Sequence, residues 1–107
     1  MISTEAGREV CEATIKEVYA EMKALREQPV EEDELMLVRN YLLGSLLGDL
    51  DGPFHIINRW KSYILNGLGE QYFHDATDTI RHITPERLQE LANKYLQPEE
   101  FYELLVL

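Results

Sequence analysis

The last seven residues of the chain constrain its fold more than any other feature. The segment Phe101-Tyr102-Glu103-Leu104-Leu105-Val106-Leu107 is aromatic and aliphatic with one charge, a composition typical of a β-strand. A lone strand leaves its backbone N–H and C=O groups without partners, so it needs a sheet to join. Three arrangements would supply that sheet. Residues 1–4 could pair with residues 101–107, the strands could pair with another chain, or most of the sheet could lie outside this sequence.

The first half of the chain predicts two amphipathic helices. The first is expected over residues 5–28, and Pro29 stops it. Its apolar residues recur at spacings of three and four, which places them on one face: Cys11, Ile15, Val18, Met22 and Leu25. The second helix is expected to begin near Glu31, because four consecutive acidic residues suit the positive end of a helix dipole. Gly44 and Gly48 lie four apart on this helix, a spacing that favours a tight helix crossing.

The second half predicts three shorter helices bounded by turn residues. Asp51-Gly52-Pro53 opens a helix over residues 53–66, which Gly67 ends. A fourth helix is expected over residues 71–82, and Thr84-Pro85 gives the clearest start signal, that of the fifth. The fold class predicted is therefore α+β and predominantly helical. It contains about five helices and a short antiparallel sheet remnant formed by the terminal strands.

Composition excludes several classes of function. The formal net charge is −10, and the ten basic residues are scattered among 20 acidic ones, which disfavours nucleic acid as a partner. No apolar run approaches 18 residues, so no membrane span is expected. Cys11 is the only cysteine, which rules out an intrachain disulfide and a multi-cysteine metal site. Residues 1–5 do not have the pattern of a signal peptide, and the compartment stays open.

Several segments together resemble the insulinase/pitrilysin-type zinc peptidases. The stretch from Glu34-Leu35 through Arg39-Asn40-Tyr41-Leu42 to Gly44-Ser45 is similar to a helix of that family that reads roughly "EL-x-x-a-k-n-y-l-x-G-s". The break at residues 51–53 and the later Asn66-Gly67-Leu68 match the family's next helix and its "yGL" end. Ile83-Thr84-Pro85-Glu86, with Tyr95-Leu96, resembles its closing helix. The resemblance lies in the order and spacing of these pieces, and it covers essentially all 107 residues.

The resemblance implies a role as scaffold. A domain of this family is an α/β sandwich about twice this length, and two such domains form half of a clamshell around an extended peptide. One domain carries the inverted zinc motif His-x-x-Glu-His, whereas its partner shapes the substrate chamber. Neither that motif nor His-Glu-x-x-His occurs around His55, His74 or His82. Residues 1–107 are then expected to be one partial domain, the C-terminal half of a non-catalytic domain, which is inactive alone.

This interpretation assigns no catalytic, cofactor-binding or metal-binding residue to the chain. Zinc is expected in the catalytic domain of the parent peptidase. The expected partners are the rest of that peptidase and, indirectly, its peptide substrate, and exposed strand edges would allow a homodimer. Two alternatives stay open. The chain could be a self-contained helical protein–protein interaction module, or the second half of the family's catalytic domain, with Glu9, Glu12 or Glu17 supplying the third zinc ligand.

Other reactive side chains have simpler explanations. His74, Asp78 and His82 are spaced four apart and could share one helical face, a geometry that zinc can use. Such spacing is also common by coincidence on a polar helix face, which is the interpretation we prefer. Neither Ser45 nor Ser62 lies in a nucleophile elbow. Cys11 is expected to pack in the core as an inert thiol, and Trp60 to serve as a core or interface anchor.

Overall fold

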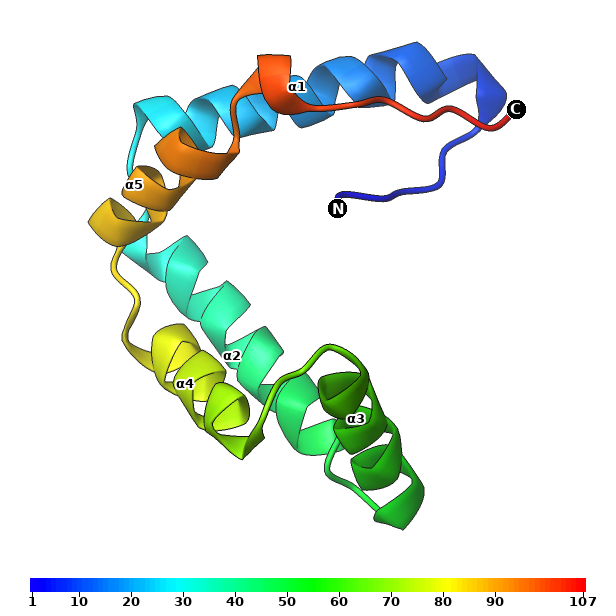
Figure 1. The fold of residues 1–107 in the computed structure, drawn as a ribbon. Coiled ribbons are helices and arrows are strands. Elements are labelled where there is room, and N and C mark those ends of the chain that lie inside the picture. The colour runs from blue at the N-terminus through cyan, green and yellow to red at the C-terminus, as the bar shows by residue number, and fades with distance from the viewer. The chain divides into compact units, whose positions relative to one another are not determined.

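The computed structural model describes residues 1–107 and is helical, with five α-helices, two single-turn 3₁₀ helices and no strand (Figure 1). The predominantly helical prediction is confirmed. The chain divides into two units. The terminal unit comprises residues 1–30 and 85–107, and the central unit comprises residues 31–84.

The terminal unit is built on the long helix α1 (Cys11–Glu27) and the last helix α5 (Pro85–Tyr95). The 3₁₀ turn η1 (Arg8–Val10) precedes α1, and η2 (Pro98–Glu100) follows α5. The prediction that α1 begins at residue 5 is wrong. Gly7 is extended, with φ −62° and ψ 146°, and no side chain caps η1 there. Without a capping side chain, Gly7 stays outside the helix, because ordering a glycine backbone costs more entropy than ordering that of any other residue.

Helices α1 and α5 pack through small and flexible apolar side chains. Met22 of α1 and Ala92 of α5 are buried, with 3% and 4% of their surface exposed. The α1 end is also held by polar contacts, because the Arg26 carbonyl oxygen accepts hydrogen bonds from Gln89 Nε2 (3.1 Å) and Asn93 Nδ2 (2.9 Å). The Arg26 guanidinium in turn donates to the Leu96 carbonyl. These bonds satisfy a carbonyl in the last turn of α1 that has no partner within the helix.

The central unit contains α2 (Glu32–Gly48), α3 (Pro53–Leu65) and α4 (Glu70–His82). The start of α2 and both ends of α3 and α4 lie within one residue of the predictions. Gly67 ends α3 and has a φ of +69°. Two backbone hydrogen bonds close this helix end, from Gly67 N to Ile64 O and from Leu68 N to Tyr63 O at 2.8 Å. This pair of bonds is the Schellman motif, whose left-handed residue is nearly always glycine.

Helices α2 and α4 lie side by side and are joined by an arginine (Figure 1). Arg39 of α2 donates from Nε to the Ile80 carbonyl at 2.9 Å and from Nη2 to the Ile83 carbonyl at 2.7 Å. The tight crossing suggested by Gly44 and Gly48 does not form within this chain. No neighbouring atom lies within 4 Å of where a Cβ would sit on either glycine.

The sheet remnant predicted from the terminal segments is not observed. Residues 1–4 form no hydrogen-bonded ladder with residues 101–107, and the only backbone bond of the C-terminal segment runs from Phe101 N to Pro98 O. Strand propensity is realised only when a second strand supplies the ladder partners. Within the chain, the N-terminal residues 1–4 do not supply them.

Candidate functional site

A cleft runs along α1 in the terminal unit. It has a volume of about 750 Å³. One wall is the predicted apolar face of α1, and the others are residues 1–6 and the C-terminal tail, which we define as residues 101–107. The tail runs beside α1, as Figure 1 shows. The α1 side chains that line the cleft are Cys11, Thr14, Ile15, Val18, Tyr19 and Met22.

Most side chains of the C-terminal tail are exposed, and Leu107 is 73% exposed. Tyr102, Leu104 and Val106 are 102%, 91% and 85% exposed, whereas Leu105 between them is 51% exposed. Phe101 is partly buried, and its backbone is extended at φ −97° and ψ 138°. The tail has the composition of a strand, but no strand pairs with it within the chain.

A polar contact joins the tail to α1. The Tyr19 hydroxyl of α1 donates a hydrogen bond to the Glu103 carboxylate, and this bond raises the pKa of Tyr19 above its ordinary value. Partial burial and the negative charge of Glu103 act in the same direction. This contact and the shared cleft place the tail along α1.

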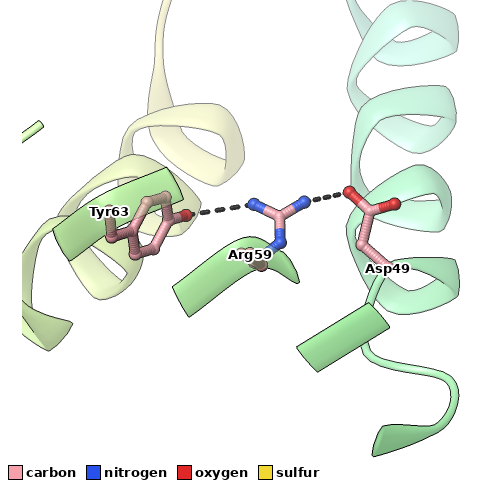
Figure 2. A network of polar contacts seen from close by, with 3 residues as sticks. All are labelled: Asp49, Arg59 and Tyr63. Carbon is pink, nitrogen blue, oxygen red and sulfur yellow. Dashed lines mark hydrogen bonds and ion pairs between the residues drawn. The ribbon is translucent and has the colours of Figure 1, made fainter. Parts of the chain in front are cut away.

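A second, smaller cavity of about 200 Å³ lies in the central unit, lined mainly by α3 and α4. Its walls are mostly aromatic and apolar: Leu50, Ile56, Arg59, Trp60, Tyr63, Glu70, Phe73 and His74. Arg59 donates to the Tyr63 hydroxyl at 3.0 Å and pairs with Asp49, as Figure 2 shows. Its guanidinium also lies 5.9 Å from the ring centres of Tyr63 and Phe73.

The arginine in this cavity is held as a cation. Burial lowers the pKa of Arg59, but its hydrogen bonds with Tyr63 and Asp49 outweigh that effect and raise the pKa above the ordinary value. Arg59 Nε is buried without a hydrogen-bond partner. Sequence reasoning missed this cluster, although a single arginine among the apolar residues of α3 was a signal that could have pointed to it.

The side chains considered from the sequence are not assembled into a reactive site. His82 Nδ1 lies 3.0 Å from the Asp78 backbone oxygen, and His74 Nε2 lies 3.7 Å from a Glu70 carboxylate oxygen. No group of three or more His, Cys, Asp or Glu side chains is placed to hold a metal ion. Cys11 is partly buried and lines the α1 cleft, so it does not belong to a closed core.

The remaining candidates lie apart on helix surfaces. Glu9 is in η1, Glu12 and Glu17 are in α1, and all three are exposed. Ser45 and Ser62 lie inside α2 and α3, where neither can form a strand-to-helix nucleophile elbow. Trp60 lines the aromatic cavity and meets Tyr63 edge to face at 6.2 Å. The α1 cleft is mainly apolar, whereas the smaller cavity combines aromatic side chains with the Arg59 cation.

None of the five helices is both long and apolar enough to cross a membrane. No protein-family model, no curated protein and no solved structure matches the chain.

Proposed function

We propose that the chain is a non-catalytic structural portion of an insulinase-type zinc metallopeptidase, the part that backs and closes the sheet of a substrate-chamber domain. On this proposal the zinc and the water-activating residues belong to another domain. The chain contributes helices and one strand, and it does not cleave peptides by itself.

The observation that carries the proposal is the open side of α1. The helix presents an apolar face to a cleft of about 750 Å³, and the tail lies along it without a backbone pairing partner. Helices over a sheet form one of the standard two-layer architectures, in which the apolar helix face is covered by strands. The missing element is then the remainder of a sheet, as expected for half of a sandwich domain.

The proposal is tested by identifying the native polypeptide. A tag is fused to the C-terminus of this sequence in its own genome, and the tagged material is purified and analysed by mass spectrometry. We expect His-x-x-Glu-His, with bound zinc, either in the same polypeptide or in one present in equal amount. A tagged chain whose mass is only 12.5 kDa plus the tag, without such a partner, would contradict the proposal.

A self-contained helical interaction module is the second candidate, and a specific observation favours it. The central unit has few buried apolar side chains and several large exposed ones on α2 and α3. These are Leu37, Tyr41, Leu47, Phe54, Ile57, Ile64 and Leu65. Extensive apolar surface of this kind marks interfaces with other proteins.

Hydrogen exchange on the isolated 107-residue chain separates the two candidates. A self-contained module should be a monomer in which the amides of residues 102–107 are protected. A portion of a larger sandwich should leave those amides unprotected in the monomer, because the tail has no ladder partner within the chain.

A further inference from the structure

We infer that Asn66 is a site of spontaneous deamidation, in which the backbone nitrogen of Gly67 attacks the Asn66 side chain, and that the hydrogen-bonded end of α3 slows this reaction. Asn66 is the only asparagine of the chain that is followed by glycine, and both residues are exposed to water. The inference does not depend on the peptidase proposal, because it uses only residues of the central unit.

The Asn66–Gly67 pair supplies every group that the reaction needs except water. The Gly67 nitrogen loses its proton to hydroxide, forms a bond to Asn66 Cγ, and displaces the side-chain nitrogen as ammonia. The product is a five-membered succinimide ring, which water opens at either carbonyl to give aspartate or isoaspartate. A Cβ on the following residue would crowd the attacking nitrogen, and glycine has none. The pair is therefore the most reactive asparagine site in the sequence.

Two hydrogen bonds hold the reacting atoms in unreactive positions. The leaving group is engaged, because Asn66 Nδ2 donates to the Ser62 carbonyl oxygen at 2.8 Å. The nucleophile is engaged as well, since Gly67 N donates to the Ile64 carbonyl oxygen at 3.1 Å. Loss of the Gly67 proton is disfavoured while a carbonyl oxygen accepts it. Both bonds must break before the ring can form.

The backbone torsion of Asn66 is also wrong for ring closure. Its ψ is 8°, close to a helical value, whereas the ring needs Cβ and the Gly67 nitrogen on the same side of the Cα–C bond. Rotation about that bond displaces the following residues and breaks the hydrogen bond from Leu68 N to Tyr63 O at 2.8 Å. The reaction thus proceeds only from a locally opened helix end, which should slow it at least about tenfold relative to the unfolded chain.

The product does not restore this helix end. A carboxylate at position 66 has no N–H to donate to the Ser62 carbonyl oxygen. Its negative charge also lies at the C-terminal end of α3, where the helix dipole disfavours an anion. Because ammonia is lost, the change does not reverse. Deamidation therefore weakens the turn between α3 and α4 in one direction only.

Peptide mapping by mass spectrometry tests the site and its protection. The full chain is incubated at mildly alkaline pH, either folded or in guanidinium chloride, and is then digested with trypsin. Cleavage after Lys61 and Arg81 isolates residues 62–81, in which Asn66 is the only asparagine. We expect this peptide to gain the mass of deamidation at least about tenfold faster in guanidinium chloride than in the folded chain. In guanidinium chloride it should also react faster than the peptides that contain the other asparagines, Asn40, Asn58 and Asn93.

A proline variant tests whether the helix end controls the rate. Leu68→Pro removes the N–H that bonds to Tyr63 O and leaves the reacting pair intact, so the folded variant should deamidate faster, with an unchanged rate in guanidinium chloride. Leu96→Pro removes the matched bond to Ala92 O at the end of α5 and should leave the rate at Asn66 unchanged. Circular dichroism verifies that both variants fold.

Three results would overturn the inference. The first is no mass gain at Asn66 in guanidinium chloride, because the pair would then not be reactive. The second is an equal rate in the folded and unfolded states of the unsubstituted chain, which needs no variant to fold. The third is a folded Leu68→Pro chain that deamidates no faster than the unsubstituted one.

Discussion

Arg39 donates from Nη2 to the carbonyl oxygen of Ile83 at 2.7 Å, so one side chain of α2 reaches the backbone just beyond the end of α4. Its Nε also donates to the Ile80 carbonyl at 2.9 Å. Both acceptors lie at a helix C-terminus, where carbonyls lack partners and a positive charge is favourable. This fork is the main polar link between α2 and α4.

Arg39→Lys should destabilise the central unit. Lysine keeps the charge but cannot donate in the fixed fork of a guanidinium, so we expect a loss of about 1–2 kcal/mol. Hydrogen exchange of the α4 amides measures the loss directly. Arg81→Lys, at an exposed arginine near the end of the same helix, is the matched control and should change stability by less than about 0.5 kcal/mol. Equal effects of the two substitutions would show that the fork contributes nothing.

Asn93→Ala should destabilise the packing of α1 on α5. The substitution removes a donor to the Arg26 carbonyl at 2.9 Å. The lost bond costs about 1 kcal/mol, partly offset by the better helix propensity of alanine, so a net loss of about 0.5–1 kcal/mol is expected. Asn40→Ala on the exposed surface of α2 should be neutral or stabilising. Urea unfolding followed by circular dichroism gives both values, and the same sign for both would be inconsistent with the contact.

Tyr63→Phe should destabilise the packing around the smaller cavity, although the phenyl ring still fills the same space. The substitution removes the hydroxyl that accepts from Arg59 at 3.0 Å and leaves the ring contacts with Trp60 and Tyr72. A hydrogen bond to a charged donor is worth about 1.5–3 kcal/mol. Because this hydrogen bond is only partly buried, we expect its removal to cost about 1 kcal/mol. Trp60 is the only tryptophan, so its fluorescence reports unfolding of this region. Tyr41→Phe, at an exposed tyrosine, should leave that transition unchanged.

The contact between Tyr19 and Glu103 predicts a dependence on alkaline pH. The pKa of Tyr19 is raised in the folded chain, so the contact stabilises the folded state at pH values below the ordinary tyrosine pKa near 10. That stabilisation is lost as the pH rises through the raised pKa. Ultraviolet titration, taken as the difference between the unsubstituted chain and Tyr19→Phe, isolates this hydroxyl.

Glu103→Gln should lower the pKa of Tyr19 towards its ordinary value, because the charged acceptor is removed. Glu99→Gln, on the nearby exposed turn η2, is the control and should leave the titration of Tyr19 in place. An unchanged midpoint in Glu103→Gln would mean that the tail is not held along α1 in solution.

Local signals in the sequence predict the helices well and their surroundings poorly. Gly67 ends α3 as expected, because a left-handed helix end needs glycine wherever the helix packs. The apolar face of α1 also follows from periodicity alone. The open cleft beside that face cannot be predicted in this way. Periodicity indicates which side chains favour burial, but not whether another part of the chain covers them.

The long-range hydrogen bonds of the arginines could not be predicted from the sequence either. Arg39 contacts residues that are more than 40 positions away in the sequence. Arg26 contacts residues of α5 that are more than 60 positions away. Such long-range pairs leave no local pattern in a single sequence. The terminal strands show the converse case, since Leu104 and its neighbours have the propensity of a strand but lack a partner to realise it.

A chelator-sensitive peptidase assay tests the proposed function most directly. The pure 107-residue chain and the tagged native assembly are each incubated with a fluorogenic unstructured peptide, with and without a zinc chelator. We predict that the native assembly cleaves the peptide and loses that activity with the chelator, while the chain alone is inactive with or without added zinc. Chelator-sensitive cleavage by the chain alone, or no cleavage by the native assembly, would contradict its assignment as the non-catalytic portion of a zinc peptidase.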